Sequence, residues 1–248
     1  QNILGVSTRE FDQQFKEWLA IRVQRAGVGP SFEGRHIDVL REKAEDDPED
    51  ARHWIWLASA YLSAKKIADA ELVLGKAEKL QADHPDLAAV KALMQLNEGL
   101  KEKSIASLRQ AIEGDSIWSW RCRLLLADQL RKRGETEEPL KLLTEATSQA
   151  PTATGSPVSS GSPWAQLATL QKDLDMEDAA IQSLQSQVLY NRDDAPTRLL
   201  LAKTLSKRED WSGVVEAAWD LPYISPYGDE GHALLSRAFL ELQDQPIH

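Results

Sequence analysis

Few residues of this chain have the types and spacing that chemistry requires. The single cysteine, Cys122, stands in an apolar stretch, where a lone cysteine packs more often than it attacks a substrate. The sequence lacks the motifs H-E-x-x-H, G-x-S-x-G, G-x-x-x-x-G-K-[ST] and the dinucleotide-binding glycine set. The five histidines are scattered, with no cysteine, histidine or carboxylate partner at metal-ligand spacing: His36, His53, His84, His232 and His248. We therefore predict no catalytic, metal or cofactor site in this chain.

The composition excludes further classes of protein. There are 29 Lys and Arg against 39 Asp and Glu, which gives a net charge of −10. Binding to nucleic acid needs a basic surface, so we expect no nucleic acid as the main ligand. No run of 18 apolar residues is present, so we expect no membrane span. Because residue 1 is Gln rather than Met, we expect a mature or excised piece of a longer product.

A sequence pattern recurs about every 34 residues, and it predicts the elements that position any functional residues. It is clearest at Trp54-x-x-Leu57-Ala58-x-x-Tyr61, followed by Ala70-x-x-x-Leu74 and Ala77. Small residues at helical spacing let two antiparallel helices approach, and large ones fill the space between them. The Leu-Ala pair recurs, with one Leu-Ser variant, at steps of 41, 34 and 34 residues: Leu126-Ala127, Leu167-Ala168, Leu201-Ala202 and Leu235-Ser236.

This pattern resembles the tetratricopeptide repeat (TPR). The resemblance implies an all-α fold: a right-handed α-solenoid of about five to six antiparallel helix pairs, here over residues 31–248. It also implies a non-catalytic scaffold for protein–protein interaction, which binds a peptide or a partner helix in a concave groove lined by the first helix of each pair.

Three irregularities interrupt the repeats. The unit over residues 87–116 is degenerate, because Lys91-Ala92 stands where Leu-Ala is expected. The 41-residue step contains residues 151–163, a run of Pro, Gly, Ser and Thr that cannot continue a helix and is predicted to be a loop insertion. Residues 229–242 supply one more first helix with no matching second helix, which leaves Phe239 and Leu242 unpaired and allows weak self-association through this helix.

Residues 1–30 are predicted to form an N-terminal amphipathic helix and a linker. Phe11, Phe15, Trp18, Leu19 and Val23 recur at helical spacing, and residues 27–30 (Gly-Val-Gly-Pro) end the helix. Residues 36–45 read as the second helix of a worn repeat, which precedes the first clear one.

The groove-facing residues fall into an apolar N-terminal stretch and a basic C-terminal stretch. Apolar side chains include Ile55, Ala89 and Leu124. A ladder of cations on successive first helices is a candidate surface for an acidic or C-terminal carboxylate segment: Arg121, Arg131, Lys172, Lys203 and Arg237. Complementing the helix dipole is the alternative role for such cations. Ile55 and Ser59 occupy positions where chaperone-binding TPR domains carry Lys and Asn, which disfavours chaperone tails as ligands.

Two interpretations are open for the tryptophans that lie off the repeat motif. Trp56 and Trp118 cluster around the first three repeats. Exposed aromatic residues on a solenoid are candidates for partner contact, and the same residues can fill space beside a degenerate repeat. The motif tryptophans Trp54 and Trp164 are predicted to pack between helices.

The N-terminal segment also resembles the closing helix of bacterial peptidase MA-like (gluzincin) domains. The residues that carry this resemblance are Leu4, Gly5, Val6, Ser7, Glu10, Phe11, Asp12, Phe15, Trp18 and Leu19. It implies an alternative function: a C-terminal accessory TPR region of a larger metallopeptidase-like protein, with the catalytic domain upstream. No residue of this chain corresponds to a metal ligand of that family. A soluble protein of the bacterial cytoplasm or cell envelope fits either function.

Overall fold

The structure is a computed structural model that describes residues 11–15, 37–153 and 162–243. The chain divides into two compact units, residues 1–150 and 151–248, and each is described by itself. The described residues contain helices and no strands. No helix among them combines the length and the apolar character needed to cross a bilayer.

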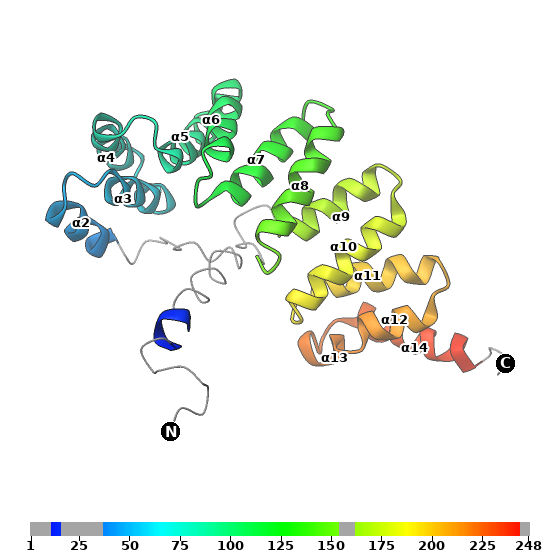
Figure 1. Cartoon of the computed structure of the whole chain (residues 1–248). Helices are drawn as coiled ribbons and strands as arrows, with labels where there is room; N and C mark the ends of the chain where they lie inside the picture. The colour runs from blue at the N-terminus through cyan, green and yellow to red at the C-terminus, as the bar shows by residue number, and fades with distance from the viewer. Residues whose placement is uncertain (1–10, 16–36, 154–161, 244–248) are drawn as a thin grey trace. The chain divides into compact units, whose positions relative to one another are not determined.

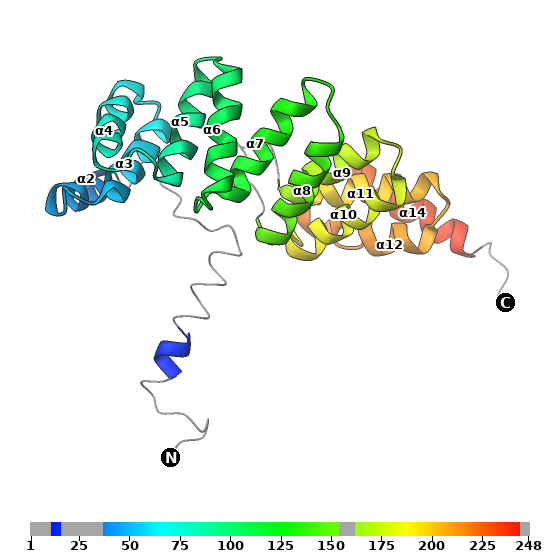
Figure 2. The same cartoon turned by 45° about the horizontal axis from the view of Figure 1, so that its top comes forward.

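The N-terminal unit contains helices α2 to α8, which pack as consecutive pairs joined by short turns (Figures 1 and 2). Helix α2 lies against α3, in the place predicted for the worn repeat. Three complete pairs follow, α3/α4, α5/α6 and α7/α8. The bounds are α2 Ile37–Asp46, α3 Ala51–Ser63, α4 Ile67–Leu80, α5 Pro85–Asn97, α6 Lys101–Glu113, α7 Ser119–Arg131 and α8 Glu137–Gln149.

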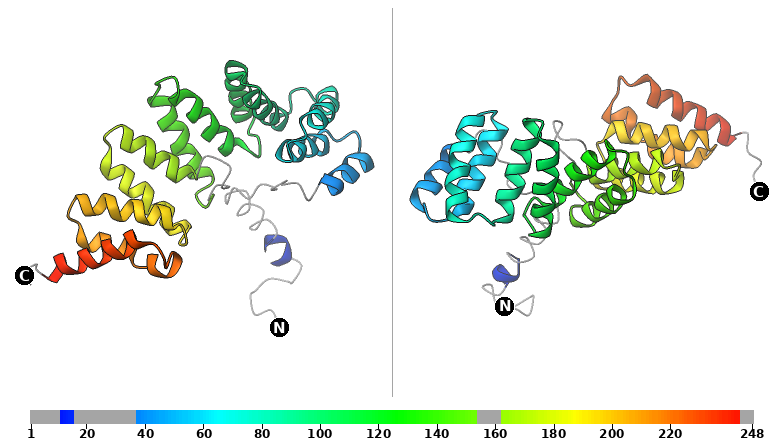
Figure 3. Two further views of the ribbon diagram at one scale, coloured as in Figure 1. Left: turned by 180° about the vertical axis from the view of Figure 1, so that it is seen from behind. Right: turned by 90° about the horizontal axis from the view of Figure 1, so that it is seen from above.

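The C-terminal unit continues the same plan with the pairs α9/α10 and α11/α12 and a final helix, α14 (Figure 3). The second helix of the last complete pair stops at Ala218 and restarts at Leu221 as the short α13. Pro222 explains the break, because it has no N–H to bond the carbonyl of Ala218. The bounds are α9 Pro163–Asp173, α10 Glu177–Tyr190, α11 Ala195–Lys207, α12 Trp211–Ala218, α13 Leu221–Ile224 and α14 Asp229–Gln243.

A common numbering makes the repeats comparable. We count Leu57, Lys91, Leu126, Leu167, Leu201 and Leu235 as position 7 of repeats one to six. Position 8 is then a small residue that is fully or almost fully buried in the five complete repeats, and position 24 is a buried leucine in the first four. The position 8 residues are Ala58, Ala92, Ala127, Ala168 and Ala202, and the position 24 leucines are Leu74, Leu108, Leu143 and Leu184.

The turn inside each complete pair has the same backbone conformation. Position 15 has a positive φ in all five, although only two of the residues are glycine. The left-handed region costs a non-glycine residue roughly 1 kcal/mol, so this turn is imposed by packing of the two helices rather than chosen by its residue. The residues are Lys65 (φ 59°), Gly99 (75°), Gly134 (82°), Asp175 (56°) and Glu209 (59°).

Side chains that cap the helices explain where several of them begin. Asp50, Ser162, Asp194 and Asp210 each accept a hydrogen bond from a backbone N–H in the first turn of the following helix. Of the predicted N-terminal amphipathic helix, only residues 11–15 are described; they are helical, with the rings of Phe11 and Phe15 stacked 6.2 Å apart. The remainder of that prediction lies outside the described residues.

Candidate functional site

A nitrogen at position 4 of the first helix contacts the turn that precedes the repeat. Two tryptophans, an arginine and a histidine occupy this position in four repeats, and each reaches a backbone carbonyl oxygen upstream. The pairs are Trp54 Nε1 with Pro48 O (2.9 Å), Trp164 Nε1 with Pro151 O (3.0 Å), Arg198 Nε with Arg192 O (2.7 Å) and His232 Nε2 with Pro226 O (3.2 Å). We call this contact the position 4 anchor. The motif tryptophans therefore bind their own array.

The anchor also shows how the array accommodates extra residues. The acceptor lies 6 residues before position 4 in repeats one, five and six, and 13 residues before it in repeat four. The additional residues of repeat four therefore stand between Pro151 and Trp164. The hydrogen bond is kept despite them, so the first helix is held at its turn in the same way.

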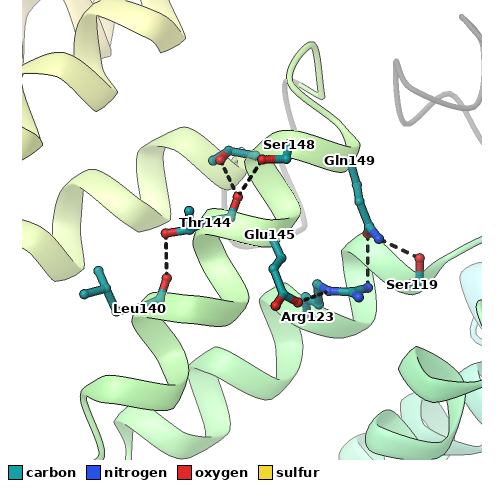
Figure 4. Close-up of polar contacts among 8 residues, drawn as sticks. Ser119, Arg123, Leu140, Thr144, Glu145, Ser148 and Gln149 are labelled. Atoms are coloured by element: carbon teal, nitrogen blue, oxygen red, sulfur yellow. Dashed lines mark hydrogen bonds and ion pairs between the residues drawn. The ribbon is translucent and has the colours of Figure 1, made fainter.

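In repeats three and five, an arginine at position 4 is paired with a carboxylate at position 26, which lies on α8 in repeat three and in the break between α12 and α13 in repeat five. Arg123 Nε donates to Glu145 Oε2 at 3.0 Å, and its Nη1 donates to Gln149 Oε1 at 3.1 Å (Figure 4). Arg198 pairs with Asp220 at 2.8 Å. Both guanidinium groups are largely buried, so these pairs hold two helices together and are not available to a ligand.

The first helices of the C-terminal unit present a mixed basic and apolar face. Position 9 carries Thr169, Lys203 and Arg237, and position 12 carries Lys172, Ser206 and Leu240. Position 5 carries Ala165, Leu199 and Ala233. None of these nine side chains is buried. We call them the first-helix face.

The cations of the first-helix face are only weakly held by neighbouring side chains. Lys203 Nζ lies 2.8 Å from Glu230, and Arg237 Nε lies 3.5 Å from Glu241; all four side chains are at least two-fifths exposed. Arg237 also stacks over the ring of Trp211 at 4.9 Å. Within the described residues, Lys172 is exposed and has no ion pair. Exposed ion pairs contribute about 0–1 kcal/mol, so an incoming carboxylate can replace them at little cost.

The remaining candidate cations lie in the N-terminal unit. Arg121 is exposed and its guanidinium lies 5.1 Å from the centre of the Trp120 ring, whereas Arg131 is half-buried. The apolar stretch predicted here is not a surface at Ile55, Ala89 and Leu124, all of which are buried. Helices α3 and α5 contact each other directly beside Ile55 and Ala89, whereas Leu124 lies on α7, which packs against α6 and α8.

The off-motif tryptophans offer little surface. Trp118 is buried and Trp56 is half-buried. Trp118 therefore has little area for a partner as the structure stands, which agrees with packing better than with contact.

Two sequence interpretations about reactive groups can be compared with the structure. Cys122 is buried, and burial raises the pKa of its thiol to about 12, so it is protonated and unreactive at neutral pH. The statement that no histidine has a carboxylate partner at metal spacing is wrong for His53. The turn before α3 and the first turn of α3 bring ligand atoms of Asp47, Asp50 and His53 within 4.8 Å of one another.

The Asp50 carboxylate of that cluster is already occupied by protein contacts. Both carboxylate oxygens of Asp50 bond the Arg52 side chain, at 2.6 to 3.0 Å. Arg52 thereby lowers the pKa of the Asp50 carboxyl to about 2. Asp50 caps α3, and a cation would have to displace the Arg52 side chain from the Asp50 carboxylate.

A pocket of about 620 Å³ on the C-terminal unit was not predicted from the sequence. It is lined by apolar side chains such as Leu201 and Leu205 of α11 and by polar side chains of α10 and α12 such as Gln182 and Glu216. Arg192 and Asp220, which lie outside these helices, also line it. No single sequence motif marks this pocket, because its residues come from three helices and the turns beside them.

The comparisons with known proteins agree on the fold. No family model matches the sequence, and no curated protein matches it either. Among solved structures, the chain is similar to Pseudomonas aeruginosa PilF at 18% identity (TM-score 0.60, covering 78% of this chain and 86% of that one). It is similar to PilW, a type IV pilus biogenesis factor, at 16% identity (TM-score 0.59, covering 90% and 97%).

A third similar structure is YrrB, described as a TPR protein with an unusual peptide-binding site. It shares 16% identity with this chain, with a TM-score of 0.54, covering 78% of this chain and 96% of YrrB. The chain therefore has the helical-repeat fold of TPR proteins, which confirms the predicted fold class. The peptidase resemblance rests on residues that are mostly outside the described part, and it stays a prediction.

Proposed function

We propose that this chain is a non-catalytic protein-interaction scaffold whose first-helix face binds an acidic peptide or an acidic partner helix. The observation that carries the proposal is the row of Lys172, Lys203 and Arg237 beside small and apolar residues on successive first helices. In a protein of net charge −10, such a basic row is a local exception. A carboxylate ligand would be attracted to it and away from the acidic remainder of the surface.

The chemistry of the face favours a peptide over a small molecule. Its apolar residues lie at position 5, Ala165, Leu199 and Ala233, and its cations lie at positions 9 and 12. A segment that alternates apolar and acidic side chains would satisfy both rows at once. The naming of YrrB for its peptide-binding site, and of PilW for pilus biogenesis, supports binding to protein in general. Arg121, Arg131 and Trp56 are further candidate contacts on the N-terminal unit.

The absence of catalysis is part of the proposal. Among the described residues, the clear pKa shifts have structural causes: burial for Cys122, the hydrogen-bonded side chain of Arg52 for Asp50, and ion or hydrogen-bond partners for Arg41, Arg52 and Arg208. Active sites usually shift the pKa of a cleft-lining acid or base toward neutrality. The pKa of the Cys122 thiol is raised and the pKa of the Asp50 carboxyl is lowered, so both move away from neutrality.

The test is binding of a fluorescein-labelled peptide of ten alternating Leu and Glu residues, measured by anisotropy at low and high salt. We expect saturable binding that weakens with salt, and roughly a tenfold or greater loss in Lys172→Glu/Lys203→Glu, about 1.4 kcal/mol or more. The matched control is Lys79→Glu/Lys141→Glu, which reverses two exposed lysines on second helices. Equal affinity of the two double variants, or no binding at low salt, would contradict the proposal.

A further inference from the structure

The pocket on the C-terminal unit lies among helices of two complete repeats, the fourth and the fifth. It has a volume of about 620 Å³, and α10 and α12, which contribute to it, both pack on α11 (Figure 1). Ligand sites have volumes of roughly 300–1,000 Å³. In a repeat array each unit contacts only its neighbours, so any repeats added beyond either end of the sequence would lie away from this pocket.

Helix α10 contributes a row of amide, hydroxyl and apolar side chains. Gln182, Gln185, Ser186 and Leu189 line the pocket at i, i+3, i+4 and i+7, which is the spacing of one helix face. Both glutamines are exposed, so their amides are accessible to a ligand. A side-chain amide both donates and accepts hydrogen bonds, so these residues can bond the N–H and C=O groups of a peptide backbone.

Helix α12 contributes small residues that leave room for a ligand. Gly213, Glu216 and Ala217 line the pocket, and the glycine and the alanine occupy positions 19 and 23. In repeat three the same two positions carry the larger residues Glu138 and Leu142. The space between the second helices of repeats four and five is therefore not filled from α12.

The charged groups of the pocket divide into a pair that is already satisfied and two groups that are not. Arg198 is 5% exposed and pairs with Asp220 at 2.8 Å. Its guanidinium also donates to the backbone carbonyls of Arg192 and Ala217. The side chains of Arg192 and Glu216, in contrast, are exposed and form no ion pair within the described residues. A ligand can therefore pair with a cation and with an anion here.

We propose that this pocket binds a short extended peptide segment of a partner protein, in which an apolar side chain lies between a basic residue and a carboxylate. The apolar side chain packs on Leu201 and Leu205, which are the most buried leucines of the lining. The basic residue pairs with Glu216, and the carboxylate pairs with Arg192. The row on α10 extends over about 10 Å, which is the length of about three extended residues.

This chain is a poorer source of such a segment than a different protein. The sequence contains an apolar residue between a basic and an acidic one at three places: Lys43-Ala44-Glu45, Asp50-Ala51-Arg52 and Lys76-Ala77-Glu78. Each lies in a helix or at its cap, and the central alanine is at most 4% exposed. A second copy would have to open a helix in order to present one of them in extended form.

The test is an NMR titration of the isotope-labelled chain with two end-blocked peptides, Gly-Gly-Lys-Leu-Glu-Gly-Gly and Gly-Gly-Glu-Leu-Lys-Gly-Gly. We expect one of the two orders to saturate with a Kd on the order of 1 mM, because one leucine and two exposed ion pairs contribute little. The side-chain amide signals of Gln182 and Gln185 should shift. Ser186→Trp, which fills the pocket from α10, should weaken binding roughly tenfold or more. Ser212→Trp is the matched control, because Ser212 is an exposed serine of α12 that does not line the pocket.

An exchange of charge identifies the contact with Glu216. Glu216→Lys should weaken binding of the Lys-Leu-Glu or Glu-Leu-Lys peptide roughly fivefold and strengthen binding of a Glu-Leu-Glu peptide by a similar factor. A peptide with Gln in place of Leu should not bind, because it cannot pack on Leu201 and Leu205.

Three results would overturn the inference: no saturation by either peptide order, equal affinity of Ser186→Trp and Ser212→Trp, or weaker binding of the Glu-Leu-Glu peptide to Glu216→Lys than to the wild type. The pocket is separate from the first-helix face, since neither Lys172 nor Lys203 lines it. Lys172→Glu/Lys203→Glu should therefore leave binding of these peptides unchanged. Failure here and failure of the proposed function can be told apart.

Discussion

Replacement of Arg198 by alanine should destabilise the C-terminal unit far more than replacement of its acidic partner. Arg198 is 5% exposed and donates to two backbone carbonyls, Arg192 O at 2.7 Å and Ala217 O at 3.2 Å. Hydrogen bonds from a charged donor contribute about 1.5 kcal/mol each at the low end of the range, so the two together contribute about 3 kcal/mol. The ion pair with the half-exposed Asp220 adds no more than about 1 kcal/mol.

We therefore expect Arg198→Ala to lose about 3–4 kcal/mol of unfolding free energy and Asp220→Ala about 1 kcal/mol. Arg198→Trp should recover about 1 kcal/mol relative to Arg198→Ala, because an indole N–H can remake the position 4 anchor as in Trp54 and Trp164. The assay is urea unfolding followed by far-ultraviolet circular dichroism. Hydrogen exchange of α10, α11 and α12 then assigns the loss to this unit.

An exposed arginine provides the control. Arg208 pairs with Asp178 at the surface, so Arg208→Ala should leave the unfolding midpoint unchanged. The reasoning would be refuted if Arg198→Ala cost less than about 1 kcal/mol, or if Asp220→Ala cost as much as Arg198→Ala. The second result would mean that the ion pair, and not the pair of carbonyl contacts, holds α10 and α12 to α11.

Three further predictions concern single features. Native Cys122 should resist a thiol reagent at pH 8 that labels the urea-unfolded chain at once, because burial raises its pKa to about 12; rapid native labelling would contradict this burial. Asp50→Ala should cost about 1 kcal/mol at neutral pH as a lost helix cap. The folded pKa of Asp50, about 2, lies below the usual unfolded value of about 3.9, so its stabilisation holds above about pH 4 and vanishes toward pH 2. A wild-type advantage that is constant with pH would exclude this origin. Gly99→Ala and Gly134→Ala should each cost roughly 1 kcal/mol, because their φ values are +75° and +82° and no neighbouring atom crowds an added Cβ; a neutral effect in thermal melts would show that the turn can relax.

The periodic pattern predicted the helices because it reports local packing. The motif residues, such as Leu57, Ala58 and Tyr61, lie three or four residues from one another on the helix surface. Their spacing can therefore be recognised directly in the sequence. The degenerate second repeat was recoverable for the same reason, since Leu108 and Ala111 keep their phase.

Features that join distant segments were harder to predict from the sequence. The carbonyl that anchors Trp164 lies 13 residues away, and nothing in the local sequence marks it. Arg123 and Arg198 stand where the motif has Trp, and their carboxylate partners lie 22 residues later. The apolar positions Ile55 and Leu124 were assigned to the groove from family geometry, but packing of the array buries them. Side-chain exposure at an interface between repeats is a property of the array, not of one helix.

The position 4 anchor can be made by more than one residue type. In four of the six repeats a nitrogen at position 4 bonds an upstream carbonyl, and an indole, a guanidinium and an imidazole each do so in this single chain. Substitutions among these groups keep the hydrogen bond that holds the helix in place, but they remove the tryptophan that is typical of the repeat motif. Exchange of this kind is one way in which a chain can keep the helical-repeat fold while its sequence departs from the repeat motif.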